Sequence, residues 1–225
     1  MRKNEIAHSR PRSKIVLHAA RPTLGRMSVH ELPDPALSEL SDLWRSRWPC
    51  PPIGYELSFD PDCWVRFHSP PNSKRYAETE TEHEMVLHRY NTVLTELFAG
   101  QEVYVTTVTY VMDEGFTDPA AAFDAHALNP GSRPWTRVRK DDEDDPGCTM
   151  HVHISRLQWK PGILDPLLQA VADYKCSGVI IMDTDLRRLY APYDGGADVN
   201  LTDKEERDRL KAKHADWLPR NRHGR

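Results

Sequence analysis

The chain has 225 residues, of which 39% are hydrophobic and 28% charged, and its net charge is −4. This composition is typical of a globular protein and excludes a disordered one, and no run of about 18 apolar residues is present to cross a membrane. The four cysteines are far apart and form no C-x-x-C pair, so we expect reduced thiols in a soluble, cytoplasmic protein rather than a disulfide scaffold or a zinc ribbon.

Charge is distributed unevenly along the chain. Residues 1–26 carry a charge of +6, which leaves −10 for the rest. A basic arm of this kind can bind nucleic acid or a membrane surface, but it has no interleaved aromatic residues. Met27 opens a conventional domain sequence, so we expect a disordered basic extension at 1–26, one domain at 27–218 and a tail at 219–225. An acidic domain predicts no nucleic-acid partner.

The first predicted elements are a helix and a hairpin. Residues 36–48 place leucines and tryptophans on one side of a helix that Pro49 ends. Residues 53–59 and 63–67 indicate two short strands separated by Asp60-Pro61-Asp62, a turn cluster. We therefore expect an N-terminal β-hairpin.

The middle of the chain predicts one long helix, two strands and a long connection. Residues 78–99 show the clearest helical periodicity, with Thr79 and Glu82 as a capping box and Gly100 as a left-handed stop. Residues 103–112 and 149–159 alternate as strands do. The segment 113–146 between them lacks any period and predicts a long loop.

The C-terminal part predicts helices and antiparallel strands. Residues 164–174 form a helical pattern, and 178–182 are an apolar run typical of a central strand that returns through 188–190 as a hairpin. Thr202 and Glu205 are expected to cap a last helix. Helices thus alternate with strand pairs, which predicts an α+β fold with a mostly antiparallel sheet packed by about four helices.

Two histidines are candidates for chemistry. His151 and His153 lie two residues apart on a strand and therefore share a face, a spacing that can hold a metal if a third ligand converges. The sequence identifies no such ligand. The structural alternative is a pair of polar, outward-facing strand residues, and no metal or cofactor is predicted.

Four aspartates lie near the ends of neighbouring C-terminal elements: Asp183, Asp185, Asp194 and Asp198. Paired carboxylates can perform general acid–base work or bind a hard cation. Aspartates at turns also bond the local backbone, which is the structural alternative. His151, His153, Asp183 and Asp185 are the candidates for a catalytic role.

A tight turn follows at residues 193–198. Its Gly195-Gly196 pair can cradle a phosphate with backbone amides, but the sequence lacks a phosphate-loop motif, and we interpret Asp194-Gly195 as a left-handed turn between two strands. Arg66 and His68 alternate with aromatic residues and can stack a base or a sugar. A half-buried edge strand explains the same pattern.

Several of these stretches resemble a bacterial family known as domain of unknown function 3885. The stretches are 64–70, 73–76, 89–94, 189–199 and 209–218, and the resemblance covers about residues 27–218. Its most specific element is the turn from Tyr193 to Asp198. This chain has Gly195-Gly196 where the family often has Asp-Arg-Gly, and residues 219–225 also depart from the family pattern. The resemblance implies a shared fold and no particular reaction.

These observations lead to two hypotheses about function. The first is a cytosolic interaction protein without enzymatic activity, of the immunity or antitoxin kind, that binds a protein partner; the sequence leaves its oligomeric state open. The second is a metal-dependent or acid–base hydrolase that uses the histidine pair and the aspartates. For a binding role we expect these residues: Arg66, His68, Tyr193, Asp194, Gly195, Gly196 and Asp198.

Overall fold

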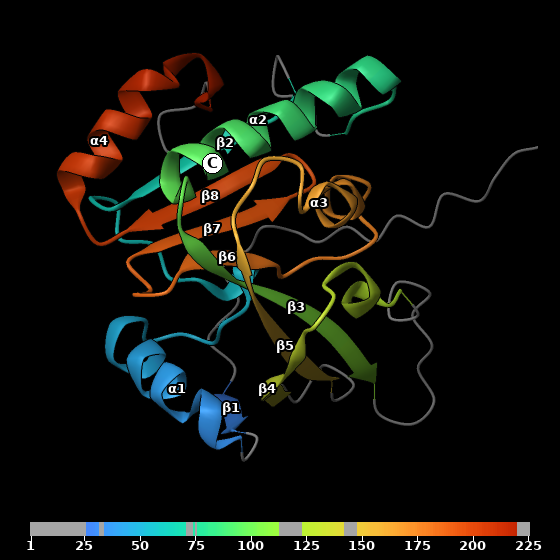
Figure 1. Cartoon of the computed structure of the whole chain (residues 1–225), viewed down its shortest axis with the longest axis vertical. Coiled ribbons are helices and arrows are strands. Elements are labelled where there is room, and N and C mark those ends of the chain that lie inside the picture. Colours follow the sequence, from blue (N-terminus) through green and yellow to red (C-terminus); the bar gives the residue numbers. More distant parts are fainter. Residues whose placement is uncertain are drawn as a thin grey trace, which may run out of the picture.

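The protein is built on one eight-stranded sheet (Figure 1). This computed structural model describes residues 26–31, 34–70, 74, 76–112, 123–141 and 148–219. The strands are β1 (Arg26–Glu31), β2 (Trp64–His68), β3 (Glu102–Met112), β4 (Arg133–Asp141), β5 (Cys148–Gln158), β6 (Ile180–Asp183), β7 (Arg188–Tyr193) and β8 (Gly196–Leu201). Their order in the sheet is β1-β4-β5-β3-β6-β7-β8-β2.

All seven strand pairs are antiparallel, which confirms the predicted α+β class. The helices of the described residues are α1 (Pro35–Arg47), α2 (Glu80–Phe98), α3 (Asp165–Ala172) and α4 (Lys204–Lys213), with short 3-10 helices η1 (Gly54–Glu56), η4 (Ala125–Leu128) and η5 (Ala215–Trp217). None of the described helices is long and apolar enough to cross a membrane. The extension predicted at residues 1–26 lies outside the described residues except for Arg26, which begins β1.

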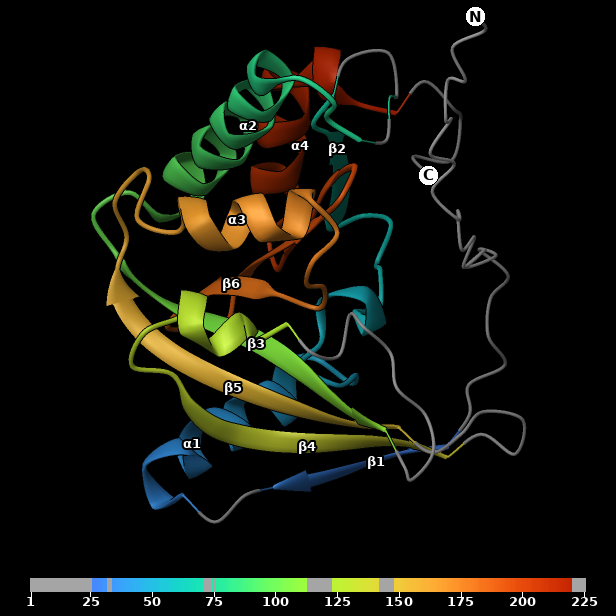
Figure 2. The ribbon, with the colours of Figure 1, turned by 90° about the vertical axis from the view of Figure 1, so that its right-hand side faces the viewer.

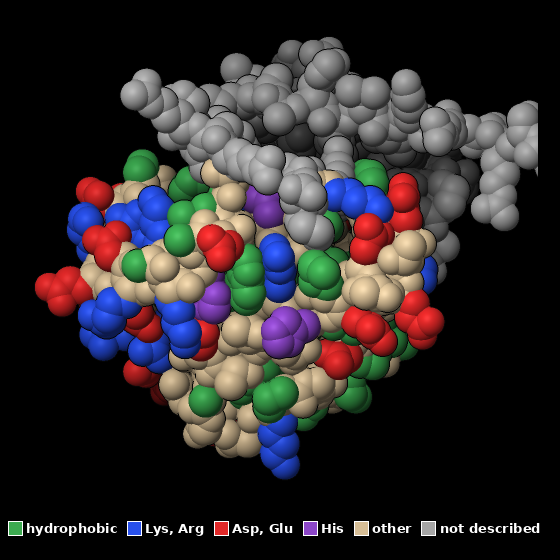
Figure 3. All heavy atoms as spheres, turned by 90° about the horizontal axis from the view of Figure 1, so that it is seen from above, with side chains coloured by type: hydrophobic (Ala, Val, Ile, Leu, Met, Phe, Trp, Pro, Cys, Tyr) green, Lys and Arg blue, Asp and Glu red, His purple; other side chains and the backbone are tan. Residues whose placement is uncertain are grey.

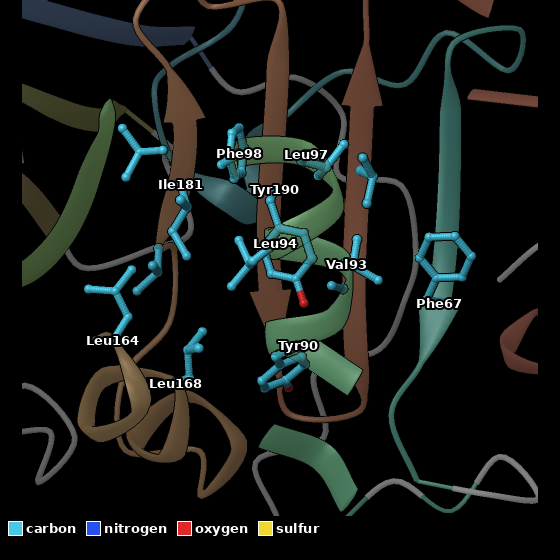
Figure 4. Close-up of a cluster of buried hydrophobic side chains, with 14 of the residues drawn as sticks. Phe67, Tyr90, Val93, Leu94, Leu97, Phe98, Leu164, Leu168, Ile181 and Tyr190 are labelled. Carbon is cyan, nitrogen blue, oxygen red and sulfur yellow. The ribbon is translucent and has the colours of Figure 1, made fainter. Parts of the chain in front are cut away.

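The sheet separates two hydrophobic cores. Helices α2, α3 and α4 cover one face, where the first core gathers around α2 (Figures 2 and 4). Helix α1 lies on the other face, where its Leu37, Leu40 and Trp44 belong to the second core and Trp44 packs against Trp135 of β4. Because side chains alternate along a strand, each central strand contributes to both cores.

Local sequence explains why α2 forms and ends where it does. Thr79 accepts a hydrogen bond from the Glu82 backbone while the Glu82 side chain accepts from the Thr79 backbone, which confirms the predicted capping box. After the helix, Gly100 has a φ of 74°, a left-handed conformation that glycine adopts without steric cost.

The predicted N-terminal hairpin is wrong. Residues 53–59 contain the 3-10 helix η1 instead of a strand, and β2 pairs with β8 from the far end of the chain. Gly54 explains the difference, because a Cβ there would lie 2.7 Å from the carbonyl oxygen of Val179. The chain is held in this close approach by a hydrogen bond from Gly54 N to Gly178 O.

The segment predicted as one long loop, 113–146, contains structure. It includes η4 and β4, and β4 pairs with both β1 and β5. The buried apolar side chains of β4 are Trp135 and Val138, and both belong to the second core. Residues 113–122 and 142–147 lie outside the described residues.

The C-terminal elements follow the prediction apart from one cap. Strand β6 lies between β3 and β7 and forms the expected hairpin with β7. The last helix, α4, is capped by Asp203 and not by Thr202, since the Asp203 carboxylate accepts hydrogen bonds from the backbone of Glu205 and Glu206.

Candidate functional site

The pairing of β2 with β8 joins two sequence stretches that lie far apart in the chain. Arg66 lies directly opposite Asp198. Arg66 donates from Nε to Asp198 Oδ1 at 2.8 Å and from Nη2 to Asp198 Oδ2 at 2.7 Å, a bidentate pair. Trp64 Nε1 adds a third bond to Asp198 Oδ1 at 2.9 Å. The carboxylate is 8% exposed, so the pair is fixed in a largely dry environment.

Aromatic rings stack on both sides of this arginine. The Arg66 guanidinium lies 5.4 Å from the Trp64 ring centre and 5.2 Å from that of Tyr193. Phe59, in turn, packs on Trp64 with ring centres 4.9 Å apart. We call Phe59, Trp64, Arg66 and Tyr193 the aromatic–arginine ladder. It lies on the sheet face that carries α1, because the residues alternating with it, Val65 and Phe67, belong to the opposite core.

The turn between β7 and β8 is set by close packing rather than by a left-handed residue. Among the residues of the described part with positive φ, none is Asp194, Gly195 or Gly196, so the left-handed turn predicted at Asp194-Gly195 is wrong. A Cβ on Gly196 would lie 1.9 Å from the carbonyl oxygen of Phe67. Glycine is therefore required at position 196 by the approach of β2, and Gly195 O accepts a hydrogen bond from Ser69 N.

His68 lies at the end of β2 beside this turn. Its Nε2 is buried and has no hydrogen-bond partner. Burial, with Arg66 and Arg89 nearby, lowers the pKa of His68, so its imidazole is neutral near pH 7. Arg89 donates from Nη1 to the His68 carbonyl oxygen at 2.9 Å.

Asp183 and Asp185 lie at a different place, the tip of the β6–β7 hairpin. Asp183 Oδ1 accepts hydrogen bonds from the backbone of Arg187 and Arg188, at 2.7 and 2.8 Å. Asp183 therefore bonds the backbone of its own turn, as aspartates at turns often do. Burial raises the pKa of Asp183. Both aspartates line an open cavity of about 440 Å³ together with Gln101, Arg187, Arg188, Thr202, Asp203 and Glu206.

His151 and His153 share a sheet face, as predicted, and a third histidine joins them. His126, in η4, lies on His153 with ring centres 3.5 Å apart. His126 Nδ1 is 2.8 Å from Thr107 Oγ1, while His153 Nδ1 is buried without a partner. We call His126, His151 and His153 the histidine group. It is half-buried under η4 rather than simply outward-facing.

The histidines and the candidate aspartates do not converge. Asp183 lies opposite Val103 on β3, whereas His153 lies opposite Thr107, on the other side of that strand. Two strand spacings and four residues separate them, which is roughly 16 Å. Asp198 is on the opposite sheet face from Asp183, and Asp194 is at the other end of β7. In the described part of the chain, no group of three His, Cys, Asp or Glu side chains could hold a metal ion.

Sequence reasoning missed two members of these groups. Phe59 lies at the end of a segment predicted as a strand, whereas in the structure it follows η1 and packs on Trp64. His126 lies in the segment predicted as a loop. The local sequence signal for η4 is Asp124, two residues before His126. Its carboxylate accepts a hydrogen bond from His126 N and caps the start of η4.

Comparison with known proteins assigns the chain to a family. The fold is that of an antiparallel α+β protein in which β2 and β8 hold the candidate site. The chain belongs to the family described as domain of unknown function (DUF3885), whose model matches residues 54–222. The match leaves residues 27–53, which include α1, outside the family model. No curated protein and no solved structure matches the chain.

Proposed function

We propose that this protein is a binding module of the cytoplasm that recognises a protein partner and has no enzymatic activity, as immunity proteins and antitoxins do. The observation that carries this proposal is the aromatic–arginine ladder. Tryptophan, tyrosine and arginine are the residues that most often dominate the energetics of protein interfaces. Here they form a stack beside the edge strand β2, and hydrogen bonds to Asp198 fix the Trp64 and Arg66 side chains.

The rigidity of the ladder favours binding. A side chain that is already fixed loses little conformational entropy when a partner covers it. Phe59 is 39% exposed at the end of the ladder, so a partner has an apolar ring to cover. Asp198 neutralises Arg66, which makes the ladder a poor site for phosphate and a better one for apolar or aromatic side chains.

The charge of the chain favours a basic partner. Outside the first 26 residues the net charge is −10, so long-range attraction acts on positively charged proteins. On the face above α2 and α4, basic and acidic side chains are interspersed (Figure 3). The net negative charge therefore increases the rate at which a basic partner meets the protein, and the ladder supplies the direct contacts with that partner.

The hydrolase hypothesis gains no support from the positions of its residues. It requires the histidine pair and the aspartates in one pocket, and they lie on different strands and on both sheet faces. Measuring the metal content of the purified protein is a direct check of that alternative.

Capture of a partner by matched variants tests the proposed function. The full chain, Phe59→Arg and Ile163→Arg are immobilised and exposed to native lysate; Ile163 is 44% exposed and serves as the control. We expect wild type and Ile163→Arg to retain the same partner in a fixed ratio, and Phe59→Arg to lose it at least tenfold. No partner in a fixed ratio, or equal retention by Phe59→Arg, contradicts the proposal. A toxin gene beside this one is the expected genomic context.

A further inference from the structure

A row of polar side chains crosses four strands at the other end of the sheet. His30 on β1 lies opposite Arg137 on β4, Arg137 lies opposite His151 on β5, and His151 lies opposite Thr109 on β3. Directly opposed residues in an antiparallel sheet project from the same face. The four side chains therefore stand side by side.

The histidine group extends this row. His153 is two residues from His151 on the same face, and His126 lies on His153 while contacting the hydroxyl groups of Thr107 and Thr109. We call this region the basic face; it consists of His30, Thr107, Thr109, His126, Arg137, His151 and His153. Helices α2, α3 and α4 lie over the strands toward the β2 edge of the sheet, and η4 is the described helix over the basic face (Figure 2).

Two polar groups on the basic face have no partner among the described residues. Arg137 is exposed and makes no ion pair or hydrogen bond through its side chain with any described residue. His153 Nδ1 is buried without a partner. A buried polar group without a partner costs stability unless a ligand or water satisfies it. Polar groups on β4 and β5 are thus available to a ligand.

The surroundings of the basic face disfavour protonation of its histidines. Burial and then Arg137 lower the pKa of His151, and burial and then His126 lower the pKa of His153 to about 4. The acid that opposes these effects within the described residues is Asp124, in front of η4. An anion placed among these groups would relieve the repulsion and favour the protonated imidazoles.

We propose that the basic face binds the phosphate group of a small molecule. Arginine presents a planar fork that matches phosphate oxygens, and imidazole and threonine hydroxyl groups supply further donors. A long polyanion is not the ligand, because the acid excess of the remaining chain repels it. This site is independent of the aromatic–arginine ladder and of the partner proposed for it.

Binding is tested with inorganic phosphate as the probe. The imidazole resonances of the full chain are followed by NMR at pH 6 while phosphate replaces chloride at constant ionic strength. We expect shifts of His151 and His153 that saturate, and a rise in the apparent pKa of both rings. Shifts that do not saturate overturn the proposal, as does an equal response to acetate.

Matched variants locate the site. Arg137→Gln removes an exposed guanidinium without disturbing a core and should weaken phosphate binding at least tenfold. Arg133→Gln, on the same strand β4 and paired instead with Asp34, should leave binding unchanged. Equal weakening by both variants, or none by Arg137→Gln, refutes the assignment. Binding should also weaken about tenfold from pH 4 to pH 6, because His153 loses its proton in this range; the opposite pH dependence contradicts the site.

Discussion

Asp198 is the residue on which the aromatic–arginine ladder depends. Both its oxygens are occupied, one by Trp64 and Arg66 and the other by Arg66 alone. Removing one partner of a buried ion pair leaves the other charge uncompensated, which costs more than the pair itself contributes. The residue is therefore expected to matter for stability as well as for binding.

Asp198→Ala should lower the free energy of unfolding by about 2–4 kcal/mol, because Arg66 and the Trp64 indole lose their acceptor. Urea unfolding measures this loss. The control is Glu102→Gln, which breaks the exposed pair with Arg156 and should cost less than about 0.5 kcal/mol. A similar cost for both variants contradicts the assigned role of Asp198.

His153 makes stability dependent on pH. Its pKa is lowered to about 4 in the folded protein, by burial and then by His126, from an ordinary value of 6.5. Protons therefore bind the unfolded chain preferentially. The free energy of unfolding is highest above pH 6.5, where both states are deprotonated, and it declines as the pH falls toward 4. Since the ring is only half-buried, solvent screening limits the effect to about 1 kcal/mol.

Urea unfolding of wild type and His153→Gln at pH 7.5 and pH 5, without phosphate, checks this expectation. The loss on acidification should be about 1 kcal/mol smaller in the variant. His30→Gln, at an exposed position on β1, is the control and should retain the wild-type loss. An unchanged loss in His153→Gln would rule out this residue as the source.

Among the elements, the β7–β8 hairpin has no room for a side chain at position 196. Gly196→Ala places a Cβ within 1.9 Å of the Phe67 carbonyl oxygen, which β2 cannot relieve without leaving the sheet. We expect a loss of more than about 3 kcal/mol in unfolding free energy. Gly100→Ala has open space around it but a φ of 74°, so it should cost only about 1 kcal/mol. Thermal and urea unfolding compare the two.

Elements governed by neighbouring residues were predictable from the sequence. The caps of α2 lie next to the helix and its apolar stripe lies within it. The strands β3 and β5 show alternating residue types along the sequence. Strand β4 was missed because arginines alternate with only two buried apolar residues, Trp135 and Val138, and a bulge at Trp135 breaks the period. Its strand character depends on pairing with β1 and β5, which no local pattern records.

The candidate site was predictable only in part. Arg66, His68, Tyr193 and Asp198 were expected to contribute to binding, and the structure brings Arg66 into contact with Tyr193 and Asp198. Their meeting could not be derived from spacing, because 132 positions separate Arg66 from Asp198. The aspartates were expected to cluster, but alternation along the strands sends Asp183 and Asp198 to opposite faces.

At the scale of the molecule, β2 is one of the two edges of the sheet. Hydrogen bonds from Leu201 N to Cys63 O and from Ser69 N to Gly195 O show that the carbonyl groups of Trp64 and His68 point away from β8. Arg207 donates to the first and Arg89 to the second, at 3.5 and 2.9 Å. The two guanidinium groups thus occupy an edge on which another strand would otherwise pair.

Arg89→Ala should expose this edge and allow two chains to associate. Sedimentation velocity over a range of protein concentrations checks this expectation, with association increasing with concentration in the variant. Arg156→Ala, an exposed arginine on the interior strand β5, is the control and should behave as wild type. A variant that sediments as wild type does at every concentration would show that Arg89 does not protect the edge.

The pairing of β2 with β8 also has a consequence during synthesis. Strand β2 emerges from the ribosome 132 residues before its partner, a delay of about 7–26 s at ordinary elongation rates. Throughout that interval Val65 and Phe67 have no strand to pair with, although α2 can already form from local contacts. The nascent chain therefore carries an unpaired, half-apolar strand until β8 has emerged, and we expect any dependence on a chaperone to be greatest in that interval.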